Sequence, residues 1–104
     1  MIHITEKARQ FSETDIPGFR TSPLWEEDGD GAYFAEFKAG ARFPLHDHEG
    51  VEQFLVLSGR IRFNEVEMTA GDFLKAGAGD EHAAYALEDT LALIAYRGGV
   101  IVKG

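Results

Sequence analysis

Two histidines and a glutamate, His46, His48 and Glu52, lie close together in the chain. Residues two apart in an extended strand point to the same face, so His46 and His48 would direct both imidazoles to one side. Glu52 opens an apolar run at residues 54–57 that we expect to form the next strand, where its carboxylate can join the imidazoles. Two histidines and one carboxylate suit a non-haem ferrous ion or a related divalent metal.

A second segment supplies a fourth candidate ligand, His82. We expect a short strand and then a glycine-rich loop, containing Gly77 and Gly79, before His82 opens another strand. The chain has no cysteine, so nitrogen and oxygen must hold any metal. The predicted cofactor is therefore one divalent ion, and iron, manganese, nickel, zinc and copper all remain open. Its predicted ligands are His46, His48, Glu52 and His82.

The spacing of these residues resembles that of the cupin superfamily. Residues 40–59 fill every position of a pattern similar to the first cupin motif, namely Gly40, His46, His48, Glu52 and Gly59. Residues 71–86 resemble the second motif, with Gly77 where proline is usual and Ala86 where asparagine is usual. The resemblance implies a small single-domain cupin of the double-stranded β-helix, or jelly-roll, type with a metal inside one end of the barrel.

Composition supports one all-β domain over residues 1–104. The chain is 44% hydrophobic and 12% aromatic, with twelve glycines separating short apolar runs, which favours a β-sandwich or barrel over long helices. A formal net charge of -8 argues against binding to nucleic acid or to an anionic membrane. No run resembles a signal peptide or could span a bilayer, so a cytoplasmic protein is expected.

The expected strands follow from alternation and turn residues. Residues 1–18 read as an extended arm with a short strand at residues 2–5, and Pro23 favours an edge position for the strand that follows. In the strand at residues 32–39, Tyr33, Ala35 and Phe37 share one face. Ile61 and Phe63 should point inward, and residues 64–65 should form the tip of a tight hairpin.

A mostly apolar pocket should surround the metal. Four of its predicted lining residues share strand parity with ligand or inward positions, and these are Phe37, Phe54, Val56 and Ala84. Tyr96 could supply a hydroxyl group to a substrate or a proton step. Arg42 could pair with an acidic group of a substrate.

Three functions fit these residues. We favour a metal-dependent, iron-type dioxygenase that cleaves a small carbonyl or phenolic compound, since similar small cupins include diketone- and quercetin-cleaving enzymes. The alternatives are a non-catalytic metal- or ligand-sensing module and a sugar isomerase or epimerase, although the apolar surroundings disfavour the last. Because residues 51–57 are apolar on both faces, we also expect a homodimer.

Overall fold

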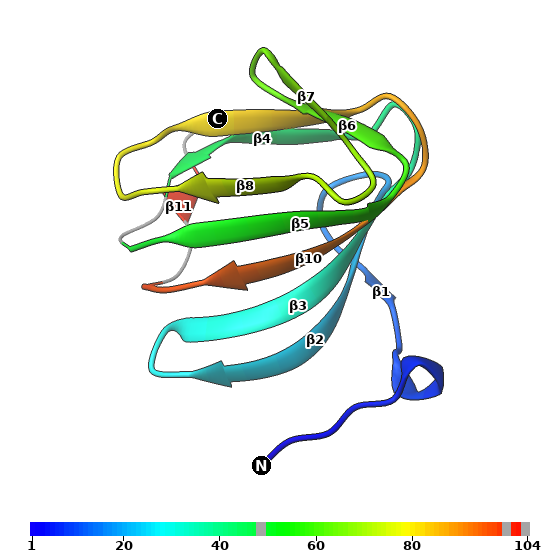
Figure 1. Ribbon diagram of the computed structural model, residues 1–104, viewed down its shortest axis with the longest axis vertical. Helices are drawn as coiled ribbons and strands as arrows, with labels where there is room; N and C mark the ends of the chain where they lie inside the picture. Colours follow the sequence, from blue (N-terminus) through cyan, green and yellow to red (C-terminus); the bar gives the residue numbers. More distant parts are fainter. Residues whose placement is uncertain (48–49, 99–100, 103–104) are drawn as a thin grey trace.

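Two antiparallel sheets stack face to face in the computed structural model (Figure 1), which describes residues 1–47, 50–98 and 101–102, with side chains described for residues 1–44 and 50–98. The first sheet contains, in spatial order, β1 (Ser12–Glu13), β2 (Phe19–Glu27), β3 (Asp30–Phe37), β10 (Thr90–Tyr96), β5 (Glu52–Ser58) and β8 (Phe73–Ala76). The second contains β11 (Ile101–Val102), β4 (Arg42–Asp47), β9 (His82–Ala86), β6 (Arg60–Phe63) and β7 (Val66–Thr69). Among the described residues, no helix is long and apolar enough to cross a membrane.

The core lies between the inner faces of the two sheets. Ile61 and Phe63 on β6 are 0% and 4% exposed, as their alternation predicts. Phe63 meets Phe54 on β5 edge to face, with ring centroids 4.4 Å apart, so this pair joins the two sheets. On β3, Ala35 and Phe37 are buried on the predicted inner face. The all-β jelly-roll prediction is confirmed.

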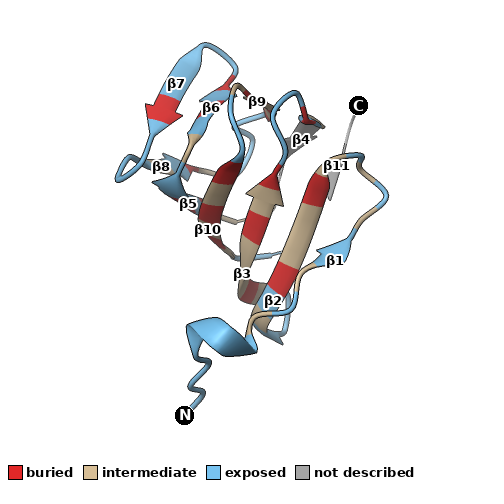
Figure 2. Cartoon of the chain, turned by 90° about the vertical axis from the view of Figure 1, so that its right-hand side faces the viewer, coloured by how far each residue is buried: buried red, intermediate tan, exposed pale blue. Residues whose placement is uncertain are grey.

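The N-terminal arm differs from the prediction. Residues 2–5 form no strand, and the arm instead contains a 3-10 turn, η1 (Glu6–Ala8), followed by β1. At the edge of the sheet β2 is paired by β1, through Ser12 with Thr21 and Glu13 with Arg20, so the part of the arm that joins the sheet is Ser12–Glu13 and not residues 2–5. Figures 1 and 2 show the first residues extending away from the sheets, with η1 exposed.

The turn between β5 and β6 passes close to the turn before β10 and contains a glycine. Gly59, the last glycine of the first motif, joins β5 to β6 with φ 91°, in the left-handed region. A Cβ atom at this position would clash with the backbone carbonyl of Asp89 and approach Thr90 to 2.7 Å. Glycine is therefore required here both by the backbone conformation and by the close passage of the turn before β10.

Candidate metal centre

Glu52 and His82 meet inside the barrel. Glu52 is the first residue of β5 in one sheet, and His82 is the first residue of β9 in the other. Glu52 Oε1 lies 3.1 Å from His82 Nε2, and the two residues are only 5% and 4% exposed. Glu52, Phe54 and Val56 alternate along β5 and are all buried, so they lie on the same inward face of the strand. The carboxylate of Glu52 therefore points into the interior beside these apolar side chains.

A backbone contact fixes the tautomer of His82. Its Nδ1 lies 3.1 Å from the carbonyl oxygen of Asp80. A carbonyl oxygen can only accept a hydrogen bond, so Nδ1 carries a proton and donates it. The second ring nitrogen, Nε2, therefore faces Glu52 and either shares a proton with the carboxylate or offers its lone pair to a cation. A histidine that donates one N–H to a carbonyl and keeps the other nitrogen for a metal is the usual arrangement of a metal ligand.

The two remaining predicted ligands are only partly within the described structure. His46 lies on β4, and its backbone is paired with that of His82 on β9. The side chain of His46 and all of His48 lie outside the described residues. Among the side chains that are described, no three histidine, aspartate or glutamate residues form a group that could hold a metal ion. Glu52 and His82 are therefore the two predicted ligands whose side chains the structure describes, and they are in contact.

Tyr33 and Tyr96 are close to this end of the barrel. Their rings lie 5.9 Å apart. Burial raises the pKa of Tyr33 far above its ordinary value, and the nearby acidic groups of Glu52 and Tyr96 raise it further, so Tyr33 keeps its proton. Tyr96 donates a hydrogen bond of 2.6 Å to Glu26, and partial burial together with this acceptor raises the pKa of Tyr96 to about 12.

Three of the predicted pocket residues line a small interior cavity beside the candidate ligands. Phe37, Phe54 and Ala84 line it together with Glu52 and Tyr33. Its volume is about 10 Å³, which is roughly the space of one water molecule. In the described part of the structure these aromatic rings therefore fill the interior rather than enclose a substrate-sized space.

The other three predicted pocket residues lie elsewhere. Val56 is fully buried and is not among the residues lining that cavity. Arg42 is exposed, and its guanidinium group stacks on the ring of Tyr85, 4.8 Å from the ring centroid. Tyr96 is half-buried at the rim, where it is bonded to Glu26.

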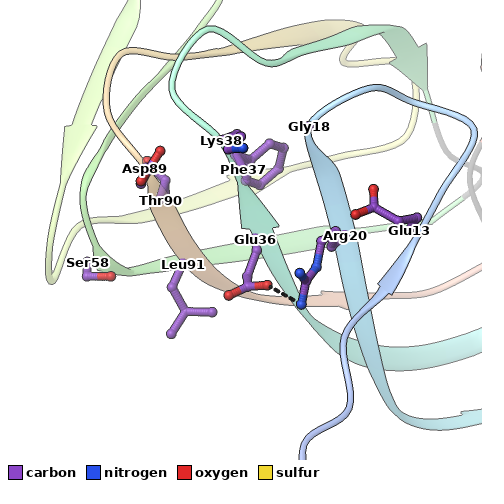
Figure 3. Close-up of a pocket in the computed structure, with 10 residues that line it drawn as sticks. All are labelled: Glu13, Gly18, Arg20, Glu36, Phe37, Lys38, Ser58, Asp89, Thr90 and Leu91. Carbon is purple, nitrogen blue, oxygen red and sulfur yellow. Dashed lines mark ion pairs between the residues drawn. The ribbon is translucent and has the colours of Figure 1, made fainter.

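A larger cavity of about 550 Å³ lies at the other end of the same strands (Figure 3). It is lined by Ser58, Thr90 and Leu91 and by an ion pair in which Arg20 lies 3.2 Å from Glu36. Glu52 and Ser58 are the two ends of β5, about 20 Å apart in an extended strand. This cavity is therefore separate from the Glu52–His82 pair.

The site also contains neighbours that the sequence patterns did not single out. Tyr33 shares one strand face with Ala35 and Phe37 in the sequence pattern, and that parity is the available signal for its place beside Glu52. Asp80 acts through its backbone carbonyl, which no side-chain pattern can reveal. The sequence pattern predicts Asn64 at a hairpin tip, but its contacts with the residues on either side of His82 depend on tertiary structure.

Two stacked antiparallel sheets with a histidine–carboxylate pair buried at one end define a cupin barrel. The chain belongs to the ChrR cupin-like family, because the model of the ChrR cupin-like domain matches residues 1–101. A comparison with curated proteins gives no match.

Solved structures with the same fold have diverse functions. A chain in the structure of Rhodobacter sphaeroides SigE in complex with the anti-sigma ChrR is 28% identical (TM-score 0.75), and the match covers 88% of this chain and 50% of that one. An acetylacetone dioxygenase from Acinetobacter johnsonii is 12% identical (TM-score 0.76; 98% and 72% covered). The polyketide cyclase RemF from Streptomyces resistomycificus is 16% identical (TM-score 0.80; 100% and 86% covered). The last two similarities establish the fold alone.

Proposed function

We propose that this cupin binds one divalent metal ion through His46, His48, Glu52 and His82. The observation that carries the proposal is the buried contact of 3.1 Å between Glu52 Oε1 and His82 Nε2, with the opposite ring nitrogen of His82 engaged by the Asp80 carbonyl. The pair fits a cation because it places a carboxylate oxygen and an imidazole nitrogen side by side, two donor types that divalent transition metals accept.

The residues around the pair prepare it for such a role. The Asp80 carbonyl holds the Nδ1 proton of His82, so Nε2 is the nitrogen presented to the interior. Phe54 and Phe63 pack edge to face in the core and are almost fully buried, and Tyr33 remains a protonated hydroxyl group near Glu52. When bound, the cation would supply a Lewis-acid centre for an oxygen-containing ligand, and iron would add a redox centre.

Metal titration calorimetry on purified protein tests the binding proposal. Wild-type protein should bind one equivalent of a divalent metal, and Glu52→Gln and His82→Gln should each weaken binding by at least about 10-fold. His3→Gln is the matched control, because His3 is exposed and lies outside both motifs, and it should bind as wild type does. Equal affinity in all four proteins would refute the proposal.

We further propose a catalytic use of the metal, in which the iron-loaded protein acts as a dioxygenase on a small carbonyl or phenolic compound. Structural similarity to the acetylacetone dioxygenase from Acinetobacter johnsonii supports this use. Oxygen consumption by iron-loaded protein, measured with a panel of diketones and flavonols and with His82→Gln as the inactive control, is the test. Absence of turnover across the panel would count against a dioxygenase.

The second candidate function is a metal- or ligand-sensing module without catalysis. Two observations favour it: the interior cavity beside Glu52 is only about 10 Å³, and the SigE–ChrR structure contains a related chain that is 28% identical. Such a module would act through a protein partner. Binding of a purified sigma factor that changes when metal is added, in a protein inactive toward the whole substrate panel, would favour sensing over catalysis.

The homodimer remains a prediction, and the outer face of the six-stranded sheet supports it. The strand register places Phe34, Leu93, Leu55 and Phe73 in one row across β3, β10, β5 and β8. Phe73 is 58% exposed, so part of this row is open to solvent. Light scattering at micromolar concentration should give twice the monomer mass, and Phe73→Ser should reduce it; a monomeric wild type would reject the prediction.

A further inference from the structure

We propose that Asn64 is a positioning residue for His82, holding the start of β9 so that the imidazole keeps one orientation. The inference rests on the proposed metal site, since His82 is one of its ligands. Asn64 follows β6 and begins the turn into β7, so it belongs to a hairpin that supplies none of the candidate ligands.

Three hydrogen bonds join Asn64 to the residues on either side of His82. The backbone N–H of Asn64 donates to the Ala83 carbonyl (3.0 Å), and the Ala83 N–H donates to Asn64 Oδ1 (3.1 Å). Asn64 Nδ2 donates to the Glu81 carbonyl (3.2 Å). Regular pairing of β6 with β9 ends at Phe63 and Ala84, so the side chain of Asn64 continues the sheet contact past His82.

Two independent requirements select asparagine at this turn. The backbone of Asn64 has φ 51°, a left-handed conformation that asparagine tolerates better than most residues. The two neighbouring backbone groups need an acceptor and a donor at once, and an amide side chain provides both. Aspartate would retain the side-chain acceptor but lose the side-chain donor. Glycine would adopt the positive φ without strain but would remove both side-chain hydrogen bonds.

We call the three hydrogen bonds of Asn64 with Glu81 and Ala83 the clamp. The clamp acts on the part of the chain that orients the His82 ring. Glu81 lies between Asp80, whose carbonyl accepts the Nδ1 proton of His82, and His82 itself. Phe63, the residue before Asn64, packs edge to face against the His82 ring with centroids 5.6 Å apart. The same hairpin therefore supplies both the packing surface for the ring and the hydrogen bonds that hold its backbone.

The alternative is that Asn64 only stabilises the hairpin, and two comparisons separate the roles. Asn64→Gly keeps the turn conformation accessible and removes the amide, so the fold should persist. Asp28→Gly is the matched control, because Asp28 is the other described non-glycine residue with positive φ (52°) and lies in the β2–β3 turn. Asn64→Asp tests the donor to Glu81 separately from the acceptor for Ala83.

The readouts are taken with and without metal. In metal-free wild-type protein, nitrogen NMR of the imidazole should show His82 protonated at Nδ1, and the Ala83 amide should exchange slowly with solvent. Asn64→Gly should give mixed tautomers, faster Ala83 exchange and metal binding weakened by about 10-fold or more. Asn64→Asp should fall between Asn64→Gly and wild type, and Asp28→Gly should match wild type.

These readouts separate failure of the clamp from failure of the metal site. If wild-type protein binds no metal, the proposed function fails, while the tautomer and exchange data on metal-free protein still test the clamp. If Asn64→Gly keeps the wild-type tautomer, Ala83 exchange rate and metal affinity, the role of Asn64 is confined to the turn and the inference is overturned.

Discussion

The carboxylate of Glu52 and the imidazole of His82 come from different sheets and touch in the barrel interior, with Oε1 3.1 Å from Nε2. Neither side chain is more than 6% exposed. A carboxylate and an imidazole lone pair at this distance repel each other unless a proton or a cation lies between them. A divalent metal binds the deprotonated carboxylate and the lone pair of a neutral imidazole, so metal binding at this pair would be coupled to the release of any proton that the pair holds.

Truncation of this pair should destabilise the metal-free protein. Glu52→Ala leaves His82 buried without its carboxylate partner, and breaking a buried pair in this way should lower the free energy of unfolding by about 3 kcal/mol. Glu67→Ala is the control, because Glu67 forms an exposed ion pair with Arg60 (3.3 Å) that should contribute less than about 1 kcal/mol. Urea unfolding in the presence of a chelator measures both. Equal stability of the two variants would contradict the prediction.

Metal addition should stabilise the folded protein. A ligand that binds only the folded state at 100 times its Kd raises the free energy of unfolding by about 2.7 kcal/mol. Thermal unfolding scans with increasing metal concentration should show a rising Tm in wild-type protein that a chelator reverses. At the same metal concentration the Tm of His82→Gln should rise less than that of wild-type protein, because its metal affinity is lower; an equal rise in this variant would place the binding elsewhere.

Alkaline pH should destabilise the protein through Tyr96. The folded-state pKa of Tyr96 is raised from 10.0 to about 12, so between these values the folded protein binds more protons than the unfolded chain. The free energy of unfolding should therefore fall as pH rises from about 10 to about 12. Tyr96→Phe should flatten this part of the pH profile.

Glu26→Gln removes the charge that favours the protonated phenol of Tyr96, so it should lower the Tyr96 pKa in an absorbance titration. An unchanged pKa would argue against the Glu26 contact.

Alanine at Gly59 should cost more stability than alanine at Gly71. Both glycines have a left-handed φ, 91° and 92°, so both substitutions incur backbone strain of about 1 kcal/mol or more. A Cβ at Gly59 would also clash with the Asp89 carbonyl, whereas nothing lies within 4 Å of a Cβ at Gly71. Denaturant unfolding of the two variants should show the larger loss for Gly59→Ala, and equal losses would mean that the turn can relax.

The sequence predicted the sheet architecture because alternation and turn residues act locally. Ile61 and Phe63 point inward and Asn64 begins a hairpin turn, as the pattern indicates. The strand predicted at residues 2–5 is wrong because a strand needs a partner strand, and the residues of the arm that pair with β2 are Ser12 and Glu13, a tertiary feature that local alternation does not give. Local propensity in an arm therefore does not fix its structure.

The candidate site was only partly predictable, because contacts between strands distant in sequence decide it. The motif spacing identified Glu52 and His82, which the fold brings into contact. The small interior cavity depends on how the rings of Phe37 and Phe54 pack, and strand parity cannot give that volume. The Asp80 carbonyl is a backbone group, and its hydrogen bond to His82 becomes visible only in three dimensions.

The location of Glu52 and His82 on separate sheets has a mechanical consequence. Any opening motion that parts the two sheets at this end must first break the link between these side chains. A cation bound by both would strengthen that link, so metal loading would slow the opening of the barrel as well as stabilise its closed form.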